Sequence, residues 1–299
     1  MSAAADRPHA RAPLEWPGGA RCAASFSFDV DGESAALAAA PGTARSLSVM
    51  THQAYGPRVG VGRLLDILDR VGVRSTFFVP GFTAELHPGA VRDIAAAGHE
   101  IAHHGYHHVR PAGLDPEQQA EQLDRGSDAL ERLTGDRPLG YRAPMWDLSW
   151  EMPALLAERG FLYDSSLMDD DFPYVLSPGE QGAAEGARTL VEIPIQWALD
   201  DWEQYCFLPD VTELGPIQTP AHAVELWRSE LDGMREHGGC WVLTNHPFLS
   251  GRPGRAAVLE RFMADVAAMS DVWIAPLGEI ARRTVEQAPA PRGLPRIEP

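Results

Sequence analysis

The chain has 299 residues, a formal net charge of −17 and a hydrophobic content of 44%, which excludes a chain that is disordered throughout. The acidic balance disfavours nucleic acids and anionic membranes as partners, because the charges would repel each other. All 25 basic residues are Arg, so chemistry that needs a lysine amine, such as Schiff-base catalysis or a Walker A phosphate loop, is excluded.

The two ends of the chain, residues 1–19 and 286–299, are rich in Pro, Ala and Arg and are expected to be irregular. No long linker divides residues 20–285, which we expect to form one domain. Residues 1–19 lack the apolar stretch of about 7–15 residues that a signal peptide needs, and no window approaches the roughly 18 apolar residues of a membrane span. The three cysteines include no CxxC pair, so no disulfide framework is indicated. We therefore expect a cytoplasmic protein.

Short apolar runs alternate with amphipathic patterns along the chain. The predicted strands are Ala23–Asp29, Ser75–Val79, Glu100–Ala102, Leu139–Arg142, Phe161–Tyr163, Leu190–Pro194, Trp241–Asn245 and Val272–Ala275. The predicted helices are Val61–Val71, Gly89–Ala97, Pro116–Leu133, Ala223–Arg235 and Ala256–Met269, with Asp115 as N-cap and Gly135 as stop of the third. Such alternation predicts an α/β fold with a mainly parallel sheet, here a distorted (β/α) barrel with about seven or eight parallel strands.

Titratable residues follow the predicted strands, at the ends that carry the site in parallel β/α folds. Asp29 and Asp31 end the first strand, and five of the eleven histidines lie within residues 99–108 around the third. Two nearby carboxylates allow one to bind a metal ion and the other to act on its bound water. Imidazoles four residues apart can face one ion, but the spacing leaves three pairs open: His99/His103, His103/His107 and His104/His108.

Later strand ends add Arg142, Asp200, Asp201 and His246. Nearby aromatic residues are candidates for the walls of a substrate pocket, although each could equally belong to the core: Trp146, Trp197, Trp202 and Phe248. The weakly periodic stretch 41–58 follows the first catalytic strand and ends in Arg58, a candidate substrate-binding residue. Such a stretch either closes over substrate or forms a surface excursion.

These blocks resemble, in order, the five motifs of the polysaccharide deacetylase (NodB-homology) family of metal-dependent amide hydrolases. The segment 28–32 resembles the family's Asp-Asp motif with Val30 inserted between the acids, and the segment 98–108 matches G-H-E-I-x-x-H-[ST]-x-x-H, which selects His104 and His108. The other three motifs match at Arg142-Ala143-Pro144, Asp201-Trp202 and Leu243-Thr244-Asn245-His246. Three departures resemble a subgroup of cyclic imide hydrolases, allantoinase-like and peptidoglycan-deacetylase-like proteins: Val30, Gly105 in place of Ser or Thr, and the absent glycine of the third motif.

The resemblance implies a NodB-like barrel in which Asp31, His104 and His108 bind one divalent ion. Zinc is expected, with iron, cobalt or manganese as alternatives. It further implies that Asp29, oriented by Arg142, takes a proton from water. His246, supported by Asp201 or Asp200, is implied as the acid that protonates the leaving nitrogen.

The expected reaction is ring opening of a small cyclic imide or cyclic amide by metal-activated water. The alternative is N-deacetylation of acetylated sugars or peptidoglycan. An inactive sugar-binding module is a lesser alternative, because every implied ligand and the acid are present. The expected partner is a small-molecule substrate, without nucleic acid or membrane, and the subgroup resemblance implies a homo-oligomer.

Overall fold

The computed structural model describes residues 14–177, 190–208 and 217–293. Eight described strands run parallel, as predicted: β1 (Cys22–Asp29), β2 (Thr76–Val79), β3 (Glu100–His103), β4 (Gly140–Tyr141), β5 (Tyr163–Asp164), β7 (Leu190–Glu192), β8 (Cys240–Asn245) and β9 (Val272–Ile274). A further strand, β6 (Tyr174–Leu176), pairs antiparallel with β7 and was not predicted. The order across the sheet is β6-β7-β5-β4-β3-β2-β1-β8, with β9 beside β1.

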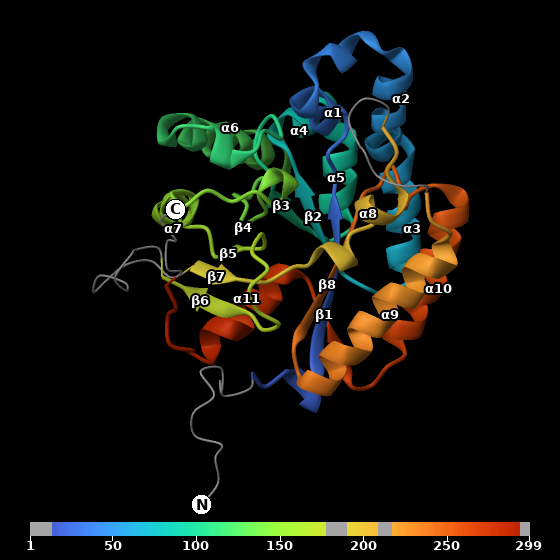
Figure 1. Ribbon diagram of the computed structural model, residues 1–299, viewed down its shortest axis with the longest axis vertical. Helices are drawn as coiled ribbons and strands as arrows, with labels where there is room; N and C mark the ends of the chain where they lie inside the picture. Colours follow the sequence, from blue (N-terminus) through green and yellow to red (C-terminus); the bar gives the residue numbers. More distant parts are fainter. Residues whose placement is uncertain (1–13, 178–189, 209–216, 294–299) are drawn as a thin grey trace, which may run out of the picture.

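The sheet curls around β1, which lies near the middle of the molecule (Figure 1). One edge of β1 pairs with β8, whereas the other edge pairs with β9 over residues 22–24 and with β2 over residues 27–29. Between β7 and β8 the described residues form a single bridge, from Asp200 to Thr244. The predicted distorted barrel is therefore confirmed, and this bridge marks its seam.

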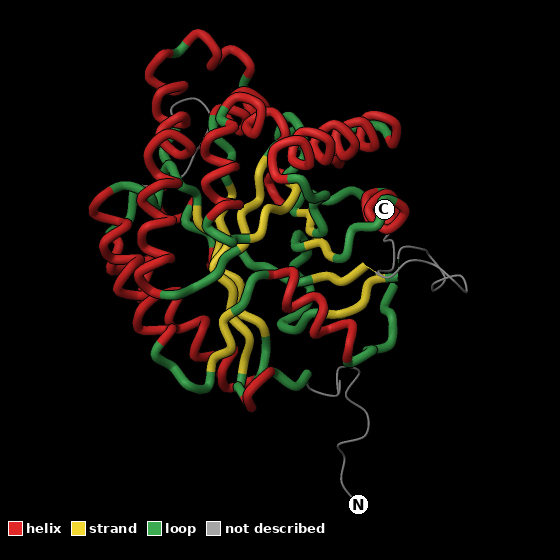
Figure 2. The backbone as a smooth tube through the Cα atoms, turned by 180° about the vertical axis from the view of Figure 1, so that it is seen from behind, coloured by secondary structure: helices red, strands yellow, loops and turns green. Residues whose placement is uncertain are grey.

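Helices cover the outside of the curled sheet (Figure 2). All five predicted helices form: α3 (Val61–Val71), α5 (Pro88–Ala96), α6 (Pro116–Thr134), α9 (Pro220–His237) and α10 (Pro253–Ala267). Shorter helices that were not predicted complete the layer: α1 (Glu33–Ala39), α2 (Leu47–Tyr55), α4 (Gly81–Leu86), α7 (Met152–Glu158), α8 (Trp202–Tyr205) and α11 (Leu277–Glu286).

The helix α6 begins and ends at the cap residues that the sequence predicts. Asp115 accepts a hydrogen bond from the Gln118 backbone N–H at 2.8 Å, and the Gln118 side chain accepts one from the Asp115 N–H at 3.1 Å. This reciprocal arrangement satisfies two N–H groups that the helix itself leaves unpaired. Gly135 ends the helix with φ +85°, which glycine adopts at little cost. Both predicted ends are confirmed.

The stretch 41–58 is largely helical, which its weak periodicity did not predict, and closure over substrate stays a prediction. It contains the 3₁₀ turn η2 (Pro41–Arg45), α2 and the start of the π turn η3 (Gly56–Gly60). Its weak helical pattern is explained by short elements that pack on several neighbours rather than along one stripe. A Cβ on Gly56 would lie 3.1 Å from the Phe248 backbone nitrogen, and one on Gly60, two residues beyond the stretch in the same π turn, would overlap the Pro247 carbonyl oxygen. The stretch is thus packed against the segment that carries His246.

Three apolar clusters hold the barrel together, one of which contains Tyr141 and Phe161. Phe26, Phe28 and Trp241 face the layer of α3, α9 and α10, and Phe78 and Tyr163 belong to a separate apolar cluster that includes residues of α11. No helix in the described ranges combines the length and the apolar character needed to cross a membrane.

Candidate active site

The carboxyl ends of the parallel strands bring together residues that are far apart in the sequence. Asp29 and Asp31 leave β1 on the same side, because Val30 between them is buried in the core. The other candidates join from neighbouring strands: His104 and His108 after β3, Arg142 after β4, Asp200 and Asp201 after β7, and His246 after β8. Each of these side chains is at least nine-tenths buried.

Asp31, His104 and His108 form a compact cluster of donor atoms. His104 Nε2 lies 3.5 Å from Asp31 Oδ1, and His108 Nε2 lies 3.5 Å from Asp31 Oδ2. On the far side of its ring, His104 Nδ1 donates to the Arg142 carbonyl oxygen at 2.7 Å. This bond leaves the lone pair of His104 Nε2 directed at Asp31.

A divalent metal ion fits this cluster. Asp31 Oδ1 is buried and has no hydrogen-bond partner among the described residues, which is costly for a carboxylate without a cation. Two ligand atoms that each lie about 2.0–2.1 Å from a tetrahedral zinc ion are roughly 3.3 Å apart. The separations of 3.5 Å between Asp31 and the two imidazoles are close to that value.

The other histidines of the same segment face elsewhere. His103 Nε2 donates to the Leu123 carbonyl at 3.1 Å, and His103 Nδ1 accepts from the Gly105 N–H at 3.0 Å. Burial lowers the pKa of His103 to about 3. His107 is exposed and its ring packs against Tyr106. The geometry groups His104 with His108, and metal binding by this pair stays a prediction.

Asp29 is held by Arg142, a fully buried guanidinium. Arg142 Nη1 donates to Asp29 Oδ1 at 2.8 Å and also to the hydroxyls of Ser27 and Thr244. Burial acts to raise the pKa of Asp29, but Arg142 and the imidazoles of His104 and His246 hold it below its ordinary value. Asp29 is therefore an ionised carboxylate, 3.7 Å from His104 Nε2.

His246 approaches the cluster from the opposite strand. Its Nε2 lies 3.6 Å from Asp31 Oδ2, while its Nδ1 lies 2.7 Å from Asp201 Oδ1 and 3.5 Å from Asp200 Oδ1. The direct hydrogen bond is therefore to Asp201. Burial acts to lower the pKa of His246, but Asp200, Asp201 and Asp31 raise it to about 10.

The group Asp200, Asp201 and His246 has the composition of a second metal site, but its donor atoms are already used. Asp201 Oδ1 accepts from both the backbone N–H and the ring of His246, and Asp201 Oδ2 accepts from Ser250 Oγ. Asp200 Oδ1 accepts from the Trp202 N–H at 2.8 Å. An ion would have to displace these hydrogen bonds. The group is therefore better suited to stabilising the imidazolium of His246 than to binding a metal.

Two of the aromatic candidates stack on each other. The rings of Trp146 and Trp197 lie 4.4 Å apart with an interplanar angle of 21°, and Arg142 lies 6.0 Å from the Trp146 ring. Trp146 has φ +53°, a strained conformation for an aromatic residue that costs of order 1–3 kcal/mol. Trp197 is 43% exposed, so this stack presents a flat surface to solvent.

Trp202 and Phe248 pack edge-on to His246, with ring centroids 5.2 and 6.0 Å from the imidazole. Phe248 is buried, and Trp202 is half-buried. Arg58 is exposed on η3. Substrate contact by these three residues and by the Trp146–Trp197 stack stays a prediction.

Several residues around Arg142 were not selected from the sequence. Ser27 and Thr244 accept from its Nη1, and Ser165 accepts from its Nε and Nη2. Small hydroxyl residues carry no pattern that separates them from ordinary strand residues. Their position at strand ends is the signal that could have found them.

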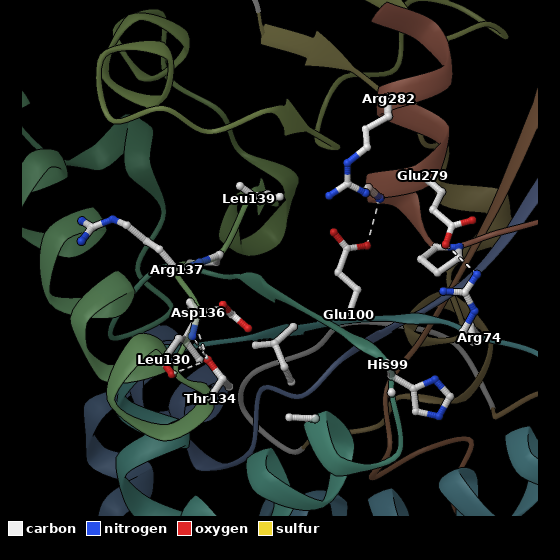
Figure 3. A pocket seen from close by; sticks show the side chains of 16 residues that line it. Arg74, His99, Glu100, Leu130, Thr134, Asp136, Arg137, Leu139, Glu279 and Arg282 are labelled. Atoms are coloured by element: carbon white, nitrogen blue, oxygen red, sulfur yellow. Dashed lines mark hydrogen bonds and ion pairs between the residues drawn. The ribbon is translucent and has the colours of Figure 1, made fainter. Parts of the chain in front are cut away.

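A separate cavity of about 570 Å³ opens at the amino ends of β2 and β3, away from Asp31 (Figure 3). Two of its charged side chains form an ion pair, with Arg74 2.6 Å from Glu279, and the Arg282 side chain lies near Glu100 (Figure 3). Glu100 accepts hydrogen bonds from Thr76 and Tyr163 within the sheet and from the Gly278 N–H, which ties the sheet to α11. The cavity therefore holds a structural ion pair, and the described residues that line it include no close group of three metal-type donors.

Comparison with known proteins points to one family. Residues 48–163 match the family model described as polysaccharide deacetylase. The peptidoglycan deacetylase-like protein FGM2 of Gibberella zeae is 33% identical over 261 residues, covering 78% of this chain and 77% of that protein.

Two solved structures share the fold over nearly their whole length. A proposed polysaccharide deacetylase from Mycobacterium smegmatis is 56% identical with a TM-score of 0.92, covering 96% of this chain and 98% of that chain. Puue allantoinase is 27% identical with a TM-score of 0.80, covering 94% and 96%.

Proposed function

Since this chain belongs to the polysaccharide deacetylase family, we propose that it is a metal-dependent hydrolase that removes an acetyl group from the amide nitrogen of an amino sugar, free or in peptidoglycan. One observation carries the proposal. An ionised carboxylate, Asp29, and a protonated imidazole, His246, flank a donor cluster that fits a metal ion. Amide hydrolysis needs this combination of a base, a charge-stabilising centre and an acid.

Asp31, His104 and His108 would hold the ion, and zinc suits their mixture of nitrogen and oxygen donors. When bound, such an ion polarises the acyl carbonyl and lowers the pKa of a water molecule. Asp29 accepts the proton of the attacking water at its Oδ2, because Oδ1 already accepts from Arg142. Arg142 thus both orients the base and keeps it deprotonated.

His246 donates a proton from Nε2 to the leaving nitrogen. Its Nδ1–H remains hydrogen-bonded to Asp201, so the ring is held in one orientation while its charge changes. A raised pKa favours the imidazolium as the resting form at neutral pH. Asp201 is in turn held by Ser250.

A second candidate is ring opening of a small cyclic imide or amide, as first expected from the sequence. The likeness to Puue allantoinase over the whole chain favours it, as does the burial of the donor cluster, since Asp31, His104 and His108 are each at most 4% exposed. The cytoplasmic location, the small-molecule partner and the homo-oligomer stay predictions.

The deciding experiment compares two product assays on one zinc-loaded sample. Acetate release from N-acetylglucosamine and its oligomers is measured beside ring opening of succinimide-like imides, hydantoins and allantoin. The proposal expects kcat/KM for an acetylated sugar to be at least about 10-fold higher, or about 1.4 kcal/mol of transition-state stabilisation. Faster ring opening would establish the second candidate, and no turnover with any divalent metal would remove both.

A further inference from the structure

A pair of buried carboxyl groups lies behind the site, and no step above uses it. Asp164 ends β5 and Glu192 ends β7, and the strand register places them opposite each other. Both side chains are fully buried. Asp164 Oδ2 and Glu192 Oε2 have no N–H or other donor within reach among the described residues, an arrangement that is costly for two ionised carboxylates.

One shared proton removes this cost, because a protonated carboxyl donates to its neighbour. Burial raises the pKa of Asp164 to about 6 and that of Glu192 well above its ordinary value. At neutral pH the pair therefore carries one proton, held mainly by Glu192, and one negative charge.

The remaining oxygens of the pair hold the turn that follows β5. Glu192 Oε1 accepts from the backbone N–H groups of Ser166 and Leu167 at 3.1 and 2.9 Å. Asp164 Oδ1 accepts from Ser166 Oγ at 2.7 Å. The turn is thus fixed at both backbone and side chain.

The same turn also holds Arg142, through the Nε and Nη2 atoms that do not contact Asp29. The Ser165 carbonyl accepts from Arg142 Nε at 3.1 Å, and Ser165 Oγ accepts from Arg142 Nη2 at 3.2 Å. Ser166 Oγ accepts from the backbone N–H of Ala143, the residue after Arg142, at 2.8 Å. The backbone from Ser165 to Ser166 therefore connects the hydrogen bonds of the carboxyl pair with those of the guanidinium.

We propose that Asp164 and Glu192 are positioning residues: they fix the Ser165–Ser166 turn, and this turn holds Arg142 in line with Asp29. The inference rests on the proposed function only for the role of Asp29 as the base. It adds a layer of the site that touches neither substrate nor metal.

The test compares two substitutions at one position. Glu192→Gln keeps the shape, still accepts from the turn and donates an N–H to Asp164 as the protonated carboxyl does, so kcat stays within about 3-fold of wild type. Glu192→Leu removes every one of these bonds. A small displacement of a catalytic group costs up to about 10²-fold, so kcat falls by about 10- to 100-fold with KM within about 3-fold and the metal content unchanged.

Glu100→Leu is the matched control. Glu100 is a half-buried carboxyl that accepts hydrogen bonds from Thr76, from Tyr163 and from the Gly278 N–H of α11, and none of these donors is Arg142 or belongs to the Ser165–Ser166 turn. It lowers the midpoint of urea unfolding while the folded enzyme keeps its kcat. Equal losses of kcat in Glu100→Leu and Glu192→Leu, or an equal loss in Glu192→Gln, would overturn the positioning role.

A readout without catalysis separates this inference from the proposed function. In ¹⁵N-arginine-labelled protein, the Nε–H of Arg142, assigned from its loss in Arg142→Lys, exchanges slowly with solvent in wild type and Glu192→Gln. In Glu192→Leu this N–H exchanges at least about 10-fold faster, because local opening no longer has to break the hydrogen bonds that Glu192 accepts from the turn. Unchanged exchange in Glu192→Leu overturns the inference, whereas absent turnover in wild type overturns only the proposed function.

Discussion

Hydrogen bonds on the far side of each imidazole distinguish the two histidine roles in this site. His104 Nδ1 donates to a neutral carbonyl, that of Arg142, whereas His246 Nδ1 donates to the carboxylate of Asp201. A carbonyl leaves the ring neutral, with a lone pair for a metal, while a carboxylate stabilises the imidazolium. The same side chain is therefore suited to a ligand in one place and to an acid in the other.

Four substitutions test which histidines bind the metal. His104→Ala and His108→Ala remove both the bound ion and most of the turnover, because each deletes one of three donor side chains. His103→Ala and His107→Ala keep the ion, since their rings lie outside the cluster. Metal analysis of the four purified proteins decides. An ion retained by His104→Ala and lost by His103→Ala would contradict the assignment.

The pH profile of kcat/KM tests the partner of His246. The acid form of His246 is present below its pKa of about 10 and is lost as the pH rises through that value. Asp201→Asn removes a carboxylate that raises this pKa, so the alkaline limb moves to lower pH while the metal stays bound. The profile is measured from pH 6 to 11 with the same substrate. An alkaline limb that does not move would assign that role to Asp200 instead.

At the level of secondary structure, the strands were more predictable than the short helices. Strands buried on both faces are continuous apolar runs, so β1 and β8 are recognised locally. The edge strand β6 is three residues long and follows an acidic segment, which hides it. The helices α1 and α8 have only 7 and 4 residues, which is too short for a helical periodicity to be recognised.

Gly60 links the stretch 41–58 to the segment that carries His246, the proposed acid. Gly60→Ala pushes a methyl group into the Pro247 carbonyl, which displaces the adjacent His246 and lowers kcat by at least about 10-fold with the metal retained. Gly62→Ala is the control, because a Cβ there meets nothing within 4 Å. It keeps kcat and stabilises α3 by about 0.5–1 kcal/mol. Steady-state kinetics and urea unfolding of both variants check this, and equal kcat values would refute it.

Over the whole molecule, the motif residues were predictable and their supporting contacts were not. Asp31, His104 and His108 sit at strand ends within recognisable motifs, so local sequence identifies them. The Asp164–Glu192 pair depends on β5 and β7 becoming neighbours, which no local pattern encodes. For the same reason the sequence left Asp200 and Asp201 as equal partners of His246, and side-chain geometry separates them.

Global stability depends on the protonation of His103. Burial lowers its pKa from 6.5 to about 3, so the neutral ring favours folding above pH 6.5 and this contribution is lost as the pH falls toward 3. The slope is about 1.4 kcal/mol per pH unit. Between pH 7 and pH 5, wild type therefore loses about 2 kcal/mol more than His103→Gln. Urea unfolding at both pH values measures this difference, and identical losses would contradict it.

Thr244 stands at the seam of the barrel and belongs to three contacts at once. It forms the bridge to Asp200, its carbonyl accepts from the Asp201 N–H, and its hydroxyl accepts from Arg142. Closing the barrel and aligning the acid with the base are consequently the same event. Opening of this seam would therefore remove one hydrogen bond from Arg142 and one from the Asp201 backbone at the same time. The seam thereby couples closure of the barrel to the alignment of Arg142 and Asp201.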